Sequence, residues 1–254
     1  MILAVDIGNS TISNAIMENG KVIQTCNVQV DKRFNIEGLK EIYLNALARS
    51  DCLGTFSDVV VSSVVPEIND MFATFSSLIF KKEPIFVDST LDLGINILTK
   101  EPGKVGTDRL TSASFAHFSQ KNSVIVIDIG TATTFDYINK NGDFLGGVIA
   151  PGAISSAKAL YESTSALIDI NILPTDKVIG DDTESAMRSG CFIGYIGLIE
   201  NILSEMKREI AEEVTVIATG GALSLFKEKL SFIDIFDEHL VFKGLYRIYE
   251  LNKI

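Results

Sequence analysis

The chain has little of what several common classes of protein require. Its three cysteines, Cys26, Cys52 and Cys191, are odd in number and lack the spacing of a metal site, so we expect reduced thiols packed as small apolar groups. His117 and His239 stand far apart in the sequence, without paired ligands. No stretch approaches the roughly 18–20 apolar residues that cross a bilayer, and the opening residues lack the features of a signal peptide. These absences predict a cytoplasmic chain with no membrane partner.

Basic runs and several nucleotide-binding motifs are also missing. The net charge is −11, from 22 basic and 33 acidic residues, and would repel a phosphate backbone, so we expect no nucleic-acid partner. The chain has no G-x-x-x-x-G-K-[ST] motif and neither H-R-D nor D-F-G, which argues against P-loop enzymes and protein kinases. No serine nucleophile elbow is present either.

A repeated segment is the main positive feature of the 254 residues, of which 46% are apolar and 22% charged, as in ordinary globular proteins. Asp6 and Asp128 lie 122 residues apart. At that same offset the sequence repeats six more residues without a gap, namely Ile7/Ile129, Gly8/Gly130, Thr11/Thr133, Ile16/Ile138, Asn19/Asn141 and Gly20/Gly142. This agreement indicates that one structural unit is used twice.

Each copy predicts three antiparallel strands. A buried strand ends in Asp-Ile-Gly, a second β-rich stretch follows, and Asn-Gly precedes a third strand. Asn-Gly is typical of a two-residue hairpin, because both central residues of that turn need positive φ. The expected strands are 2–7, 10–17 and 21–30 in the first copy, and 124–129, 132–138 and 143–150 in the second.

Helical and strand patterns alternate after each meander. Apolar spacing predicts helices over 36–47, from about 67, over 153–166 and over 183–210, and strands over 58–63, 85–88 and 214–219. Alternation of this kind indicates an α/β fold with a partly parallel sheet. We therefore predict two tandem ribonuclease-H-like domains around a cleft, residues 1–120 and 121–254, with the last helix, from about Phe242, able to pack back on the first. Asp6 and Asp128 should face one another across that cleft.

The two repeated loops carry the clearest chemistry. In each, a carboxylate at a strand end precedes a glycine turn rich in hydroxyl or amide side chains. Such a turn suits a Mg²⁺–phosphate complex, since backbone N–H groups and hydroxyls can reach phosphate oxygens while the carboxylate faces the hydrated cation. An Asp-Gly turn also occurs in any α/β protein. Two copies at one offset favour the phosphate interpretation.

Three further glycine-containing elements each allow two interpretations. In Gly106-Thr-Asp-Arg109, Asp108 could be a helix-start acid, which the residues alone favour, or the proton acceptor for an alcohol beside an anion-binding Arg109. In 146–152 and in 219–221, glycines predicted to end a strand could receive a flat ring or a phosphate, or could simply allow close packing.

These motifs together resemble the type III pantothenate kinases, members of the acetate and sugar kinase, Hsp70 and actin superfamily. The resemblance runs almost end to end. It covers Asp6-Ile-Gly-Asn-Ser10, Ser62-Ser-Val-Val-Pro66, Gly106-Thr-Asp-Arg109, Asp128-Ile-Gly-Thr-Ala-Thr-Thr134, Gly146-Gly-Val-Ile-Ala-Pro-Gly152, Ile179-Gly-Asp-Asp-Thr183 with Ala186-Met187, and Thr219-Gly-Gly221. The G-x-D-R element and the later glycine and Thr-x-x-Ala-Met stretches are specific to that family.

The resemblance implies a role for each matching position. The first ATP loop would comprise Asp6, Ile7, Gly8, Asn9, Ser10, Thr11, Ile12 and Ser13. Thr131 would contact ATP phosphate, and Asp128 would bind a monovalent cation, K⁺ or NH₄⁺, in addition to Mg²⁺. Gly106, Thr107, Asp108 and Arg109 would hold pantothenate, with Asp108 as the base. In a homodimer, Thr183 would touch pantothenate bound to the partner subunit.

Two positions depart from the family pattern. Thr99, assigned to the substrate site, stands where family members commonly carry tyrosine, seven residues before Gly106. Asp181-Asp182 replaces the more usual Arg-Asn before Thr183 and adds negative charge near an anionic substrate. These departures predict altered substrate affinity without a change of chemistry.

The activity implied is ATP-dependent phosphorylation of pantothenate to 4′-phosphopantothenate, the first step of coenzyme A biosynthesis. Two alternatives stay open: a non-catalytic nucleotide-binding regulator on the same fold, and a kinase of another small alcohol. The presence together of Asp6, Asp108, Arg109 and Asp128 favours an enzyme.

Overall fold

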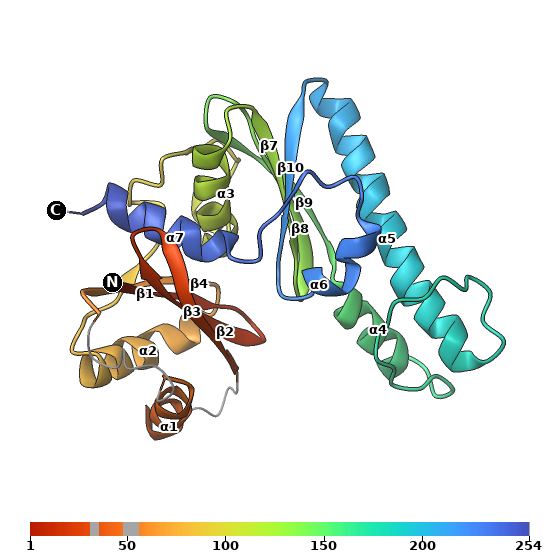
Figure 1. Cartoon of the computed structure of the whole chain (residues 1–254), viewed down its shortest axis with the longest axis horizontal. Coiled ribbons are helices and arrows are strands. Elements are labelled where there is room, and N and C mark those ends of the chain that lie inside the picture. Colours follow the sequence, from red (N-terminus) through yellow and green to blue (C-terminus); the bar gives the residue numbers. More distant parts are fainter. Residues whose placement is uncertain (31–35, 48–55, 254) are drawn as a thin grey trace. The chain divides into compact units, whose positions relative to one another are not determined.

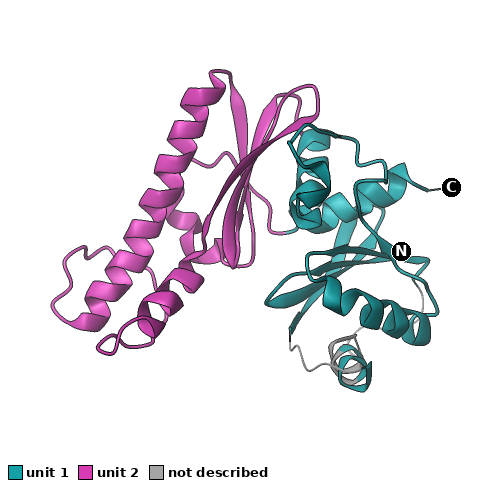
Figure 2. Cartoon of the chain, turned by 180° about the vertical axis from the view of Figure 1, so that it is seen from behind, with its two compact units in different colours: residues 1–119, 239–254 teal, residues 120–238 magenta. Residues whose placement is uncertain are grey.

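The computed structural model describes residues 1–30, 36–47 and 56–253, so Cys52 lies outside the described residues. The chain forms two compact units, residues 1–119 with 239–254 and residues 120–238 (Figure 2). Each unit has its own sheet and its own helices (Figure 1). Within the described part of the chain, no helix is both long and apolar enough to span a membrane.

The sheet of the first unit contains β1 (Ile2–Ile7), β2 (Thr11–Glu18), β3 (Lys21–Gln29), β4 (Asp58–Ser63) and β5 (Ile85–Phe86). Their order is β3-β2-β1-β4-β5. The first three strands are antiparallel neighbours, whereas β1, β4 and β5 run parallel. The central strands β1 and β4 are almost continuously buried, and each contains an apolar run, as expected for strands covered on both faces.

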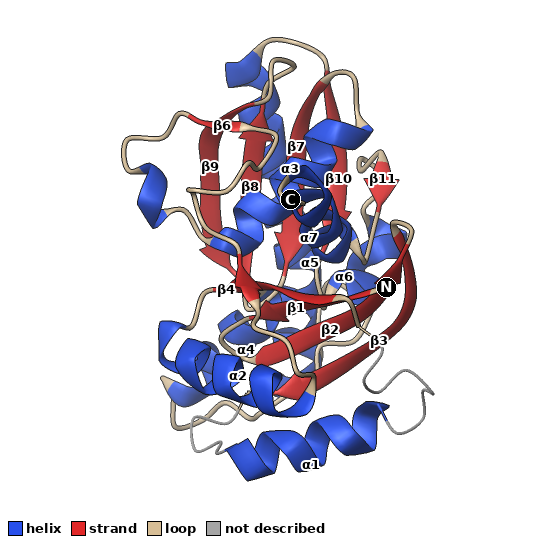
Figure 3. Ribbon diagram, turned by 90° about the vertical axis from the view of Figure 1, so that its left-hand side faces the viewer, coloured by secondary structure: helices blue, strands red, loops and turns tan. Residues whose placement is uncertain are grey.

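Helices cover both faces of this sheet (Figure 3). On one face α1 (Ile36–Leu47) and α2 (Pro66–Ile79) share a core with alternate residues of β1, formed by Leu3, Val5, Ile7, Leu39, Tyr43, Phe72 and Phe75 among others. On the other lie α3 (Thr107–Ser119) and α7 (Leu240–Leu251), which pack closely on each other. Short β6 (Asn96–Ile97) and the 3₁₀ turn at Pro102–Lys104 precede α3.

The second unit repeats this plan. Its strands are β7 (Ser123–Ile129), β8 (Ala132–Ile138), β9 (Asp143–Pro151), β10 (Val214–Thr219) and β11 (Ile235–Phe236). They follow the order β11-β10-β7-β8-β9 with matching orientations, so the predicted duplicated α/β fold is confirmed. One face of this sheet shares a core with α4 (Ala153–Glu162), α5 (Thr183–Ile210) and α6 (Leu223–Phe226), and the 3₁₀ turn at Lys227–Lys229 follows α6.

The ungapped alignment of the two copies is wrong in the second strand. Ile7 pairs with Ile12, whereas Ile129 pairs with Thr133, so the second loop is one residue shorter. Thr133 therefore takes the structural place of Ile12, and both side chains are fully buried. A one-residue slip would exchange the faces of the strand, which explains why burial follows the structural correspondence and not the sequence offset.

The hairpin turns after the second strands differ in the opposite sense, so the second copy regains the residue that its first loop lacks. Asn19 and Gly20 both have positive φ, at 49° and 76°, as a two-residue turn requires. In the second copy only Gly142 does, with φ 84°, and its N–H donates to the Asn139 carbonyl at 3.0 Å. The second turn is therefore longer than predicted.

Several element boundaries also differ from the prediction. Helix α4 ends at Glu162 instead of residue 166, and the hydroxyls of Ser163 and Thr164 donate back to the carbonyls of Ala159 and Leu160. Such back-bonding competes with helix continuation. The G-x-D-R element does not simply precede a helix, because α3 begins inside it at Thr107.

Candidate functional site

The first repeated carboxylate sits near the end of β1. Val5 and Ile7 face the core shared with α1 and α2, so Asp6 faces the opposite side of the sheet, where α3 and α7 lie. In register with Asp6 are Ser13 on β2 and Ser62 on β4. A half-buried carboxylate thus has a hydroxyl-bearing residue on each side.

The loop after β1 uses one of its backbone groups to close its own turn. The Gly8 N–H donates to the Thr11 carbonyl at 3.0 Å, so it closes the turn and is not presented to a phosphate. Ile7 and Ile12 are fully buried, which leaves only their main-chain groups for a nucleotide. Asn9 and Ser10 are exposed at the tip. Of the predicted ATP loop, these two present the most accessible side chains.

The second repeated carboxylate has equivalent surroundings. Asp128 on β7 is in register with Thr134 on β8 and Thr219 on β10. Gly220, which follows β10, has φ 108°, and a β-carbon there would lie 2.5 Å from both Asp128 Oδ1 and the Ile129 nitrogen. Only glycine permits this approach of backbone to carboxylate.

Thr131 is exposed in the loop that follows Asp128, and the start of α4 holds its backbone. The Thr131 carbonyl accepts from the Gly152 N–H at 3.2 Å and from Ser155 Oγ at 2.7 Å. A β-carbon on Gly152 would lie 2.2 Å from the Gly130 carbonyl oxygen. The loop and the helix start are therefore packed directly together.

The glycine pair of 146–152 does not end a strand as predicted. Gly146 and Gly147 lie inside β9, and a β-carbon on Gly147 would lie 1.7 Å from the Phe135 carbonyl oxygen. Gly146 pairs with Tyr137 where the register shifts. The close-packing interpretation therefore accounts for this pair.

Thr107 links α3 to the end of β4. Its hydroxyl donates to the Ser63 carbonyl and accepts from the Ser63 N–H, both at 3.0 Å, and lies 3.2 Å from Ser62 Oγ. The side chain is therefore occupied by the protein itself. Because Ser62 is the strand neighbour of Asp6, this contact joins the first loop to the start of α3 within one unit.

Asp108 is half-buried in the first turn of α3. Its Oδ1 accepts from the Arg109 N–H at 2.8 Å, and a β-carbon on Gly106 would lie 2.5 Å from the same oxygen. Burial raises the pKa of Asp108, and the Arg109 N–H and guanidinium charge oppose that rise. A raised pKa makes the ionised carboxylate a better proton acceptor.

Thr99 belongs to the same unit as Asp108. Its hydroxyl oxygen is buried and has no hydrogen-bond partner among the described residues. A buried hydroxyl usually has a hydrogen-bond partner, so the Thr99 oxygen is available to a ligand.

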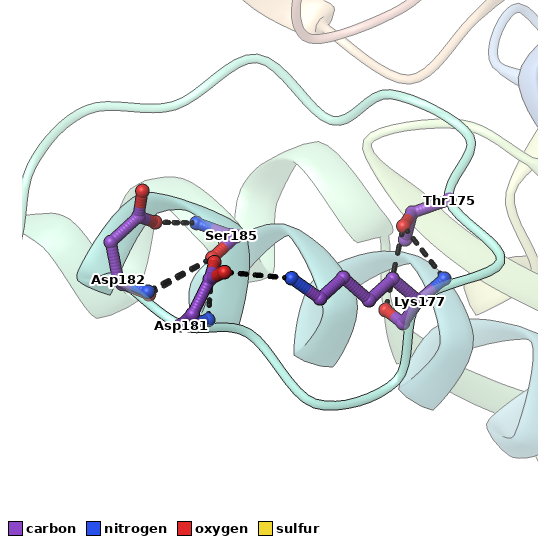
Figure 4. Close-up of polar contacts among 5 residues, drawn as sticks. All are labelled: Thr175, Lys177, Asp181, Asp182 and Ser185. Carbon is purple, nitrogen blue, oxygen red and sulfur yellow. Dashed lines mark hydrogen bonds and ion pairs between the residues drawn. The ribbon is translucent and has the colours of Figure 1, made fainter.

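Thr183 is exposed at the start of α5, in the second unit. Figure 4 shows the polar contacts of Asp181, Asp182 and Ser185, which flank it in sequence. Asp182 caps this helix: its Oδ1 accepts from the Ser185 N–H at 2.7 Å, which lowers the pKa of its carboxyl. Asp181 pairs with Lys177 Nζ at 2.9 Å. Asp182 therefore has a structural role as the N-cap of α5.

The described residues contain no group of three or more His, Cys, Asp or Glu side chains that could hold a metal ion by themselves. A single carboxylate between hydroxyls fits a cation that keeps several waters and is shared with a phosphate. Of these neighbours, Ser13 belongs to the predicted ATP loop, whereas Ser62, Thr134 and Thr219 were not assigned a role at the site. For Ser62 and Thr219 the available signal was a hydroxyl residue at or next to the end of a buried parallel strand.

A groove of about 570 Å³ runs between α4 and α5. It is lined mainly by small and apolar residues, namely Ala153, Ser156, Leu160, Ala186, Met187, Gly190, Cys191, Gly194, Tyr195 and Leu198. Nearby on the same unit, Ile154 is 61% and Ile179 82% exposed.

Comparison with known proteins agrees with this architecture. The family model of the type III pantothenate kinases matches residues 2–205. A type III pantothenate kinase of Bacillus cytotoxicus is 38% identical and covers 100% of this chain and 97% of its own length.

Two solved structures share the fold. A Campylobacter jejuni protein, provisionally assigned to the Baf family of transcriptional activators, has a TM-score of 0.62 at 18% identity over 98% of each chain. A Porphyromonas gingivalis protein, provisionally assigned as an N-acetylglucosamine kinase, has a TM-score of 0.55 at 13% identity over 100% of each chain. At these identities the likeness shows the fold alone.

Proposed function

The chain belongs to the type III pantothenate kinase family, and we propose from that premise which of its residues carry the reaction. The family's activity is ATP-dependent phosphorylation of pantothenate to 4′-phosphopantothenate, the first step of coenzyme A biosynthesis, with a divalent metal ion. The observation that supports the assignment of residues is the contact between Ser62 and Thr107, which joins β4, the strand beside Asp6, to the helix of Asp108.

Phosphoryl transfer depends mainly on positioning and on neutralising charge. We assign ATP to the loop from Asp6 to Ser13 and to Thr131, with Mg²⁺ shared between a loop carboxylate and the phosphates. Gly106, Arg109 and Thr99 would hold pantothenate, with the guanidinium on its carboxylate. Asp108 would take the proton of the attacking hydroxyl. Thr107 would act by holding Asp108 in place.

An ADP-release assay comparing pantothenate, pantetheine and simple sugars tests the activity. We expect turnover with pantothenate. Nucleotide binding without turnover on any acceptor would support the regulator instead, and turnover with a sugar but not with pantothenate would support a different alcohol kinase.

We further propose that Asp128 binds a monovalent cation. Support comes from its position between Thr134 and Thr219, which surrounds the carboxylate with the oxygen donors that hard cations prefer. Activity should be higher with K⁺ or NH₄⁺ than with a large organic cation, and Asp128→Asn should lose this difference. Equal turnover of the unaltered enzyme with all three ions would contradict the assignment.

The working unit is proposed to be a homodimer formed through the groove between α4 and α5. The apolar lining, the exposed Ile154 and Ile179 and the accessible Thr183 all support a second copy as the partner. A dimer would let Thr183 of the partner subunit reach the pantothenate held by Arg109. The cytoplasmic location stays a prediction.

Gly194→Glu tests the dimer. A β-carbon at Gly194 would meet nothing within 4 Å, so the unit should fold while a charge enters the groove. We expect light scattering to show a monomer with lowered activity. Gly103→Glu, also in open space but outside the groove, should stay dimeric. A fully active monomer, whether of the unaltered enzyme or of Gly194→Glu, would refute the proposal.

A further inference from the structure

One side chain on α5 reaches the base of the loop that follows Asp128. Tyr195 is 5% exposed, and its hydroxyl oxygen lies 2.5 Å from Thr133 Oγ1. Thr133 is fully buried and is the strand partner of Ile129, so the two residues close the loop formed by 130–132. The contact joins positions 62 residues apart in sequence.

Both hydroxyls can take part in this contact as donor or acceptor. Tyr195 is the donor when Thr133 Oγ1 donates to the Pro151 carbonyl, 3.5 Å away. Burial raises the pKa of Tyr195 to about 12, and the charge of Asp128 adds to the rise. The tyrosine hydroxyl therefore keeps its proton at neutral pH, and the ring lies within the electrostatic influence of Asp128.

The loop is held from two sides. Gly152 and Ser155, at the start of α4, donate to the Thr131 carbonyl, while Tyr195 of α5 holds Thr133. Both helices also line the apolar groove, and Tyr195 itself is part of that lining. The same two helices thus support the loop and form the proposed dimer surface.

We propose that Tyr195 is a positioning residue for the reaction, acting through Thr133 to hold the loop of Thr131 in the conformation that binds ATP phosphate beside the cation of Asp128. This inference rests on the proposed function, because it takes the nucleotide and cation roles of the loop from there. Tyr195 itself touches neither ATP nor pantothenate in this account.

Tyr195→Phe removes only the hydroxyl and tests the role. We expect the KM for ATP and the K⁺ concentration for half-maximal activity to rise about three- to tenfold, as loss of one hydrogen bond predicts. The KM for pantothenate and the dimeric state by light scattering should not change. Tyr137→Phe is the matched control, since it removes a hydroxyl bonded to Glu212 Oε1 at 2.7 Å from the same strand β8. It should leave both ATP and K⁺ constants at their original values.

Thr133→Val removes the other hydroxyl of the same contact and allows a double-mutant comparison with Tyr195→Phe. If Tyr195 acts through Thr133, the double variant should lose no more than either single variant, because both break one contact. Additive losses would overturn the proposed route. A Tyr195→Phe enzyme with a lower Tm but unchanged ATP and K⁺ constants would show a merely structural role and overturn the inference.

Direct binding separates this inference from the proposed function. Should the unaltered protein fail to phosphorylate pantothenate, the proposed function fails, and the ATP Kd from calorimetry still decides the role of Tyr195. A Kd raised in Tyr195→Phe but not in Tyr137→Phe supports it, and equal Kd values overturn it.

Discussion

Among single residues, Asp108 is the one whose surroundings bear most directly on chemistry. Its carboxylate lies over Gly106 and accepts the Arg109 N–H, with its pKa raised by burial. A free aspartate of ordinary pKa would be a weak base at neutral pH, and partial desolvation strengthens it. Asp108 can therefore be both the acidic residue at the start of α3 and the proton acceptor, so the two interpretations do not exclude each other.

Asp108→Asn keeps the size of the side chain but cannot take a proton. We expect kcat to fall by about 10²–10⁴ while ATP binding stays nearly unchanged. The Tm of the variant at neutral pH should not be lower than that of the unaltered protein, because burial disfavours the ionised carboxylate that the substitution removes. A variant that turns over at nearly the original rate would place the base elsewhere.

The pH dependence follows from the same carboxyl. Catalysis needs the ionised form, so activity should fall as pH drops through the pKa of Asp108. Because that pKa is raised, the acidic limb of kcat/KM should lie above the ordinary aspartate value of about 3.9. Arg109→Gln removes a charge that lowers the pKa, so the limb should move to higher pH. A profile recorded between acid and neutral pH checks both shifts, and a limb that moved downward would contradict the sign.

Among the elements, the start of α3 is the one that most directly positions the site. Thr107 holds the helix on the end of β4 through both backbone groups of Ser63. Thr107→Val removes these bonds and leaves a partly buried N–H and carbonyl without their partner. We expect a loss of about 1–3 kcal/mol in the free energy of unfolding, together with a lower kcat because Asp108 is less well held. Thr107→Ser keeps the hydroxyl and should retain most of both, and equal losses in the two variants would exclude the hydroxyl as the cause.

Helices α3 and α7 meet at a glycine. A β-carbon on Gly244 would lie 2.0 Å from the Thr111 carbonyl oxygen, so Gly244→Ala must push the two helices apart. We expect the free energy of unfolding to fall by about 1–3 kcal/mol in a denaturant titration. Gly197→Ala, on α5 with nothing within 4 Å, is the control and should be neutral or stabilising by up to about 1 kcal/mol. If both variants were equally stable, close packing of α3 on α7 would not matter.

For the molecule as a whole, the net charge bears on the expected absence of a nucleic-acid partner. The net charge of −11 should prevent binding to DNA at physiological salt. We expect no mobility shift with double-stranded DNA under conditions where a basic control protein binds. A salt-sensitive shift at micromolar protein would contradict this expectation.

Local sequence pattern determined much of this protein. Strands β4 and β10 and helix α5 have the predicted bounds, because buried strands and a capped helix leave their signal in neighbouring residues. The duplicated plan followed from the repeat of Asp-Ile-Gly. The predicted cleft between Asp6 and Asp128 stays a prediction.

Tertiary structure decided what depends on distant partners. The one-residue difference between the second strands arises from pairing with their neighbours, and local identities at Thr11 and Thr133 could not reveal it. The contacts of Thr107 with Ser63 and of Tyr195 with Thr133 join residues 44 and 62 positions apart. A hydroxyl carries no periodic signal in sequence, and its role is set only when folding brings its partner within hydrogen-bonding distance.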